Sequence, residues 1–186
     1  MRYSTLVLLL AAIALQVGCQ RQEKPLVIGP DAIEHVILYD TKIEGMGGRN
    51  VFIRADRSAW VQEVRPSRSG FQEARYPFEL TEEQYRDLAE ALADPSLAKM
   101  ARRRHPAVPD GSLIVIGLSL DSGEHVSIVR SRKTESLPPF DRLYGLIIQA
   151  QKDVNRLKAE HQGQLDWRWR PEGFELPESQ PEPVYE

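Results

Sequence analysis

Cysteine is nearly absent from this sequence, because Cys19 is the single thiol among 186 residues. One cysteine cannot close an intramolecular disulfide, so the folded part must be held by its hydrophobic core. The four histidines follow no zinc-ligand spacing, and no second cysteine is present to help them. His35 and His125 could meet across neighbouring strands, although two partly exposed strand histidines are the simpler interpretation. Basic residues are not in excess either, since 24 lysines and arginines against 27 acidic residues give a formal net charge of -3. We therefore expect no metal, no cofactor and no nucleic-acid partner.

Catalytic signatures are also scarce. The sequence contains neither a G-x-S-x-G elbow nor a Walker A motif, and Gly45-Met46-Gly47 lacks the last glycine of a dinucleotide loop and precedes a predicted strand. One S-x-x-K pair, Ser96 with Lys99, comes without the companion motifs of penicillin-binding enzymes. We interpret Ser96 as a helix-start residue, and the sequence identifies no catalytic residue.

Long hydrophobic runs are limited to residues 6–15, with Arg2 before them and Gly18-Cys19 after them. At about 1.5 Å per residue this run covers only about half of a ~30 Å hydrocarbon core, which favours a secretory leader over a transmembrane helix. The segment Gln16-Val17-Gly18-Cys19 resembles the lipobox of bacterial lipoproteins, although Gln16 stands where leucine is usual. An ordinary cleaved leader with an incidental cysteine is the alternative.

The lipoprotein resemblance implies a signal peptide over residues 1–18 and acylation of Cys19, for which palmitate is a suitable label. Several acyl chains would anchor the protein to a membrane, since a single chain binds only marginally. Gln20 replaces the aspartate that is typical of inner-membrane lipoproteins, so the resemblance favours the outer membrane. Residues 19–32 are polar and contain two prolines, and we expect them to form a tether.

The folded domain is predicted to span residues 33–160. Apolar residues alternate over residues 33–40, which indicates a strand. Residues 51–65 and 113–130 each indicate a hairpin, with turns at Asp56-Arg57-Ser58 and Asp121-Ser122-Gly123.

Helices are predicted between and after the hairpins. Thr81-Glu82-Glu83-Gln84 is a capping box before an amphipathic helix, and Asp94-Pro95 ends that helix. A short helical turn is expected over residues 96–100. The apolar spacing from Phe140 predicts a long helix that ends near Glu160.

These elements predict an α+β fold, with an antiparallel sheet of about five strands and two helices on one of its faces. Aligning Asp56 with Asp121 superposes the two hairpins, which suggests a strand-strand-helix duplication. Chance similarity between two hairpins explains the match equally well. Such a sheet leaves its second face open to water or to a partner.

Two surface features are candidates for contacts. Arg102, Arg103 and Arg104 can contact anionic groups of lipid or lipopolysaccharide, although a solvated helix end is the simpler interpretation. Trp167 and Trp169 alternate with arginines, and such rings can stack on a sugar, lie at a membrane interface or dock on the domain's own sheet. We favour docking on the sheet. Residues 161–186 are predicted to form a tail whose part after Pro171 is rich in proline and glutamate and builds no core.

The sequence thus predicts a lipid-anchored protein of the bacterial envelope. Its domain, in the periplasm or at the cell surface, is expected to bind an envelope protein or a surface ligand. The alternative is a small envelope hydrolase whose polar residues are brought together only by the fold.

Overall fold

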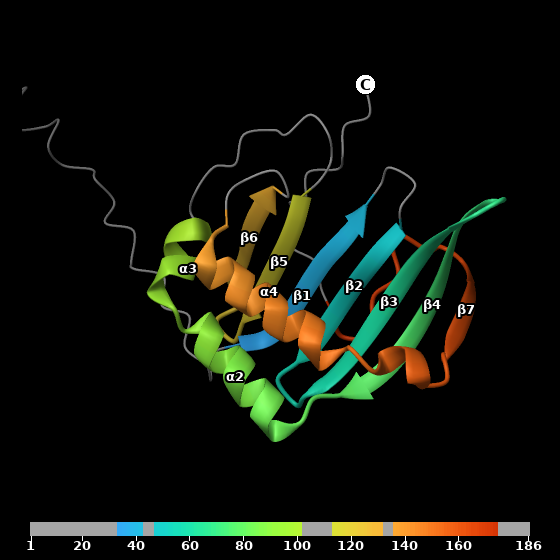
Figure 1. Cartoon of the computed structure of the whole chain (residues 1–186). Coiled ribbons are helices and arrows are strands. Elements are labelled where there is room, and N and C mark those ends of the chain that lie inside the picture. The colour runs from blue at the N-terminus through green and yellow to red at the C-terminus, as the bar shows by residue number, and fades with distance from the viewer. Residues whose placement is uncertain (1–32, 43–46, 102–112, 132–135, 175–186) are drawn as a thin grey trace, which may run out of the picture.

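The computed structural model describes residues 33–42, 47–101, 113–131 and 136–174. The lipobox with Cys19, the tether, and Arg102, Arg103 and Arg104 lie outside these residues. Within them the chain forms one antiparallel sheet and three α-helices (Figure 1). The strands are β1 (Ile33–Lys42), β2 (Gly47–Arg54), β3 (Ser58–Ser67), β4 (Gly70–Glu79), β5 (Leu113–Leu120), β6 (His125–Ser131) and β7 (His161–Gln164). The helices are α2 (Glu82–Leu92), α3 (Pro95–Ala101) and α4 (Pro138–Ala150), and a 3-10 turn, η2 (Val154–Arg156), follows α4.

The seven strands run in the order β6-β5-β1-β2-β3-β4-β7. Every neighbouring pair is antiparallel. The α+β class with an antiparallel sheet is therefore confirmed, whereas the expected five strands and two helices were too few. The strands that were not expected are β4 and β7, and the short helical turn expected over residues 96–100 forms the third helix, α3.

Strand β4 was not predicted, because its sequence, GFQEARYPFE, contains four polar or charged residues and a proline. Ala74, Tyr76 and Phe78 still pack in the core, while the alternate residues point to the other side of the sheet. Strand β7 pairs only with residues 72–75 of β4, so Pro77 lies where β4 has no outer partner among the described residues. A proline is tolerated at such an edge position because no partner strand needs its amide.

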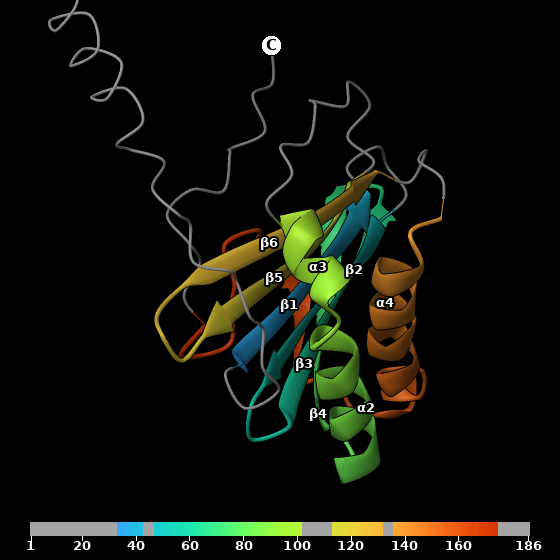
Figure 2. The same ribbon diagram turned by 90° about the vertical axis from the view of Figure 1, so that its left-hand side faces the viewer.

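The main core lies between the sheet and the helices, and Figure 2 shows α2 and α4 together on one side of the strands. Strand residues such as Leu38, Val51 and Ile116 contribute to it, and Phe140 and Leu143 from α4 pack against them. All five side chains are fully buried. This single layer of contacts accounts for most of the apolar area that the domain buries.

Helix α2 begins where the sequence places it. The backbone N–H of Gln84 donates to the hydroxyl of Thr81 at 3.1 Å, and the N–H of Thr81 donates to the Gln84 side chain at 2.9 Å. Glu82 and Glu83 occupy the first turn, where carboxylates favour the positive end of the helix. The capping box is thus confirmed.

Helix α4 is shorter than expected, because it ends at Ala150 rather than near Glu160. Gln151 is buried directly after it and accepts a hydrogen bond from Arg49 of β2 at 3.3 Å. The chain then turns through η2, which places Val154 in the core and leaves Leu157 exposed. This change of direction brings the following residues alongside β4 as β7.

The two predicted hairpins flank β1, which lies between them. Val61 and Val126, equivalent in the alignment on Asp56 and Asp121, both face the helices. However, β4 intervenes between the first hairpin and α2, whereas the described residues include no strand between the second hairpin and α4. The strand-strand-helix unit is therefore not repeated in its simple form.

Candidate ligand-binding site

The sheet has a second face, opposite the helices, and it carries aromatic side chains. Ile37, Phe52 and Trp60 lie on neighbouring strands and alternate with residues of the main core, so they point away from the helices. Phe52 is fully buried although no helix covers it. The layer that buries it comes from the end of the described chain.

Residues 165–174, here called the C-terminal segment, pack on this second face. Phe174 is 7% exposed, and its ring centroid lies 5.5 Å from that of Phe52 and 6.0 Å from that of Trp60. The ring of Trp169 meets Phe52 edge-on at 5.5 Å. The second face is therefore partly covered rather than open, and Pro171 and Phe174 are buried although no core was expected after residue 170.

The two tryptophans of the segment do not share a surface. The N–H of Trp169 donates to the carbonyl of Asp166 at 3.2 Å, which closes a turn and separates the indoles that an extended chain would align. Trp169 docks on the sheet, whereas Trp167 is 51% exposed, and its ring centroid lies 6.0 Å from that of Phe71. Only Trp169 contributes to the layer over Phe52.

A buried polar network fastens the start of the segment. Gln62 donates from Nε2 to Glu73 Oε2 at 2.5 Å and to the carbonyl of Asp166 at 3.0 Å, and it accepts from Asn50 at 2.8 Å. The N–H of Asp166 donates to Glu73 Oε2 at 3.3 Å. Glu73 is fully buried and also pairs with Arg75. A buried carboxylate needs several partners to offset its lost hydration, and one of them, the N–H of Asp166, belongs to the backbone of the segment.

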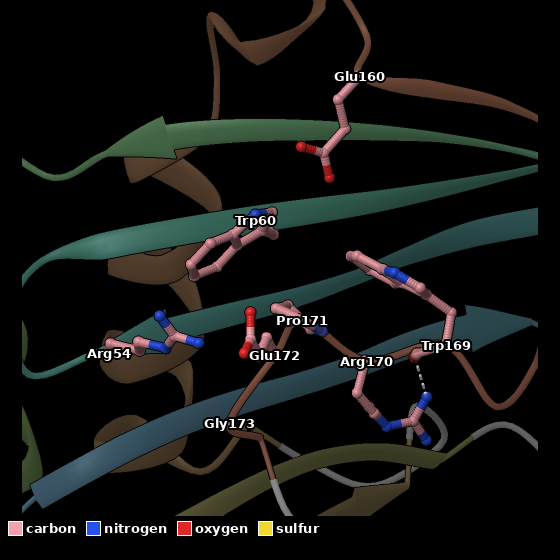
Figure 3. A pocket seen from close by; sticks show the side chains of 8 residues that line it. All are labelled: Arg54, Trp60, Glu160, Trp169, Arg170, Pro171, Glu172 and Gly173. Atoms are coloured by element: carbon pink, nitrogen blue, oxygen red, sulfur yellow. Dashed lines mark hydrogen bonds between the residues drawn. The ribbon is translucent and has the colours of Figure 1, made fainter.

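A pocket of about 520 Å³ opens beside the docked segment. Arg54 at the end of β2 and Trp60 on β3 form its sheet side. The other lining residues precede β7 or belong to the segment: Glu160, Trp169, Arg170, Pro171, Glu172 and Gly173. Figure 3 shows the indoles of Trp60 and Trp169 on two sides of the hollow, with the carboxylates of Glu160 and Glu172 entering from different ends.

The arginines of the pocket lean on rings rather than on carboxylates. The guanidinium of Arg54 lies 4.9 Å from the ring centroid of Trp60 and 5.3 Å from that of Phe174. Arg170 donates to the carbonyls of Trp167 and Trp169, and Figure 3 shows its guanidinium turned away from Trp60. Such contacts over aromatic faces contribute about 0.5–1 kcal/mol each at exposed sites.

The acidic groups of the pocket have no partner among the residues that the structure describes. Neither the Glu160 nor the Glu172 side chain forms a hydrogen bond or an ion pair with a residue that the structure describes. Gly173 has a φ of +79°, and a Cβ there would lie 3.3 Å from Arg54, so glycine lets the chain turn closely past the guanidinium. The pocket thus offers two indoles, two free carboxylates and a guanidinium to an incoming molecule.

The remaining candidates do not form a catalytic group. His35 and His125 are not on neighbouring strands, because β5 lies between them, and His125 is 3.0 Å from the hydroxyl of Ser119. Burial lowers the pKa of His35 from its usual value of 6.5, and the charge of Arg54 lowers it further. Ser96 lies at the start of α3, where its N–H donates to Asp94.

The described residues contain no group of three or more histidine, cysteine, aspartate or glutamate side chains placed to hold a metal ion. None of the helices in this part of the chain has the length and hydrophobicity needed to cross a membrane.

Sequence reasoning singled out Trp169 but missed Trp60, Arg54, Glu160 and Glu172. The sequence did contain a signal for Trp60, because this residue stands between Ala59 and Val61 in a predicted strand and must therefore point to the opposite face of the sheet. The sequence contained no signal for Arg54, Glu160 and Glu172, because these residues come together only through the path of the C-terminal segment.

Comparison of the chain with models of protein families, with curated proteins and with solved structures gives no match.

Proposed function

We propose that this protein is a lipid-anchored component of the bacterial envelope whose α+β domain binds a surface ligand. The pocket between Trp60 and Trp169 carries the proposal. The hollow of about 520 Å³ is within the size range of ligand sites, and it is lined by two indoles, a proline and four charged side chains. The lipobox-like segment ending at Cys19 supplies the anchor, and the outer membrane is its favoured location.

The pocket is preformed. Its sheet side is fixed by the pairing of β2 with β3, and its other side is fixed by the Glu73 network and by Phe174. A ligand therefore meets side chains already in position and does not have to order the segment first. Preorganisation of this kind increases affinity because less conformational entropy is lost on binding.

Binding is favoured over hydrolysis by the chemistry of the walls. The residues that line the pocket include no serine, histidine or cysteine, so they lack the nucleophile and base pair of serine and cysteine hydrolases. Of the lining residues, only the carboxylates Glu160 and Glu172 could serve a hydrolase, in the manner of a glycoside hydrolase. The envelope hydrolase thus remains the weaker alternative. A protein partner is also compatible with this site if it inserts a side chain into the hollow.

Tryptophan fluorescence tests the site directly, because two of the three tryptophans line the pocket and Trp167 does not. The full chain, purified in detergent, is titrated with cell-wall glycan, lipopolysaccharide or phospholipid vesicles. We expect one of these to change the emission of the wild type and of Trp167→Phe, and to bind Trp60→Phe and Trp169→Phe at least about tenfold more weakly. Equal affinity for all four proteins, or no response to any component, would contradict the proposal.

The anchor has a separate test. Cells that express the wild type or Cys19→Ala are labelled with a palmitate analogue, and the protein is isolated. We expect label only in the wild type. Equal label in both proteins would remove the lipid anchor from the account while leaving the pocket unaffected.

A further inference from the structure

The walls of the pocket indicate which kind of molecule it accepts. Trp60, Trp169 and Pro171 supply flat apolar surface, and the partnerless carboxylates and Arg54 supply acceptors and donors beside it. A suitable ligand must therefore present apolar C–H surface on one face and polar groups around its edge. Rings of the pyranose type have this arrangement, with hydroxyl groups that both donate and accept.

The charges in the pocket are balanced. Arg54 and Arg170 carry positive charge, and Glu160 and Glu172 carry negative charge, so the lining has no net charge. A pocket built for a phosphate or another anion would have an excess of arginine or lysine without opposing carboxylates. A neutral ligand matches the balanced lining better than an anion does.

A cationic ligand is disfavoured by the arginines that already lie on the indoles. Arg54 lies over Trp60, and Arg75 lies 4.4 Å from the ring centroid of Trp169. An ammonium group would bind by placing its charge over the same electron-rich rings. It would thus be repelled by guanidinium groups of the chain at both indoles, whereas a neutral ring with C–H groups carries no charge for them to repel.

We propose that the pocket binds a neutral saccharide, with a pyranose ring against Trp60 or Trp169 and its hydroxyls donating to Glu160 and Glu172. The inference rests on the proposed ligand-binding function and names the class of ligand. Arg54 then donates to ring or hydroxyl oxygens at the sheet side of the pocket. In the envelope the same chemistry comes from cell-wall glycan strands or from the sugars of lipopolysaccharide.

Calorimetric titration of the full chain in detergent tests this inference. The probes are a β-1,4-linked N-acetylglucosamine tetramer, a maltose-type tetramer and, as charged comparators, phosphocholine and a basic tetrapeptide. We expect one of the saccharides to bind and its affinity to change less than about twofold between 0.05 M and 0.5 M salt, since screening acts on charged partners. Binding of a comparator with strong salt dependence, or no binding of either saccharide, would overturn the inference.

Substitutions separate hydrogen bonding from charge. Glu160→Gln retains an acceptor and loses the charge, so a saccharide should bind this variant within about threefold of the wild type, while a cation would bind it far more weakly. Trp169→Ala should lower saccharide affinity by about tenfold or more, and Trp167→Ala serves as the control with unchanged affinity. Equal loss in Trp169→Ala and Trp167→Ala would place the saccharide elsewhere and contradict the inference.

Further binding assays identify the source of the sugar and show which of the two proposals has failed. Co-sedimentation with purified cell-wall sacculi and retention on lipopolysaccharide micelles identify which glycan is bound. A pocket-dependent fluorescence response to phospholipid vesicles, without binding of any saccharide, would reject the saccharide and keep the binding function. Absence of any response would reject both.

Discussion

Replacing Phe174 with alanine tests how firmly the C-terminal segment is held on the second face. The phenyl ring is 7% exposed and lies against Ile37 and Phe52, with the ring of His35 at 4.5 Å. Burial of such a side chain contributes about 1.5–3 kcal/mol, and its aromatic pairs contribute about 0.5–1.5 kcal/mol more. We therefore expect Phe174→Ala to weaken docking of the segment by about 2–4 kcal/mol, which raises the undocked fraction roughly 30- to 700-fold.

Hydrogen exchange measures this effect locally. The N–H of Leu165 donates to the carbonyl of Phe71 at 3.0 Å, and the N–H of Asp166 donates to Glu73, so both amides are protected only while the segment is docked. Exchange in residues 165–174 should accelerate in Phe174→Ala. Exchange in β1 and α4 should change much less, because the main core does not include Phe174.

The control is Trp167→Ala, whose ring is 51% exposed. A surface substitution of this kind should change stability by no more than about 0.5 kcal/mol. Unchanged exchange in residues 165–174 of Phe174→Ala would show that Phe174 does not hold the segment. Equal acceleration throughout the domain would show that the segment is not a separate layer.

Three further predictions concern other parts of the domain. Glu73→Ala removes the carboxylate that pairs with Arg75 and that accepts from Gln62 and from the N–H of Asp166. It should lower the free energy of unfolding by about 1–3 kcal/mol in denaturant titrations, and a loss below about 0.5 kcal/mol would contradict the role of the network. Burial lowers the pKa of His35 from 6.5, so the contribution of this histidine to stability should be complete above pH 6.5 and should decline as the pH falls below that value. His35→Gln should abolish this decline in urea midpoints measured at several pH values. An identical decline in the wild type and in His35→Gln would contradict this prediction. Gly47 has a φ of +67°, and a Cβ there would lie 2.2 Å from the carbonyl oxygen of Val64, so Gly47→Ala should lower Tm. Gly145→Ala, on the exposed side of α4, should instead raise stability by about 0.5–1 kcal/mol. Equal Tm values for the two variants would refute the steric explanation.

Local signals predicted the parts of the fold that depend on neighbours in sequence. The capping box at Thr81 determines the start of α2 with residues three positions apart, and the turn at Asp56 is closed by its bonds to Ser58. Strand alternation likewise placed β1 and both hairpins. These features need no knowledge of distant residues, so a sequence pattern is sufficient to find them.

Distant contacts determine the parts that the sequence did not predict. Glu73 makes β4 look like a polar loop, yet it is buried because Asp166, far along the chain, donates to it. Helix α4 ends early where Gln151 is held by Arg49 from β2. The pocket has the same origin, since Arg54 and Glu172 meet only when the C-terminal segment crosses the sheet, and no local pattern records that path.

We propose above all that a ligand of the bacterial envelope binds in the pocket. A photoreactive amino acid placed at Glu172, which lines the pocket, and separately at Leu157, which is exposed outside it, tests that claim in intact cells. After illumination we expect a covalent adduct that contains carbohydrate from position 172 and none from position 157. Adducts of equal yield from both positions, or none from position 172 in a correctly folded protein, would contradict the account.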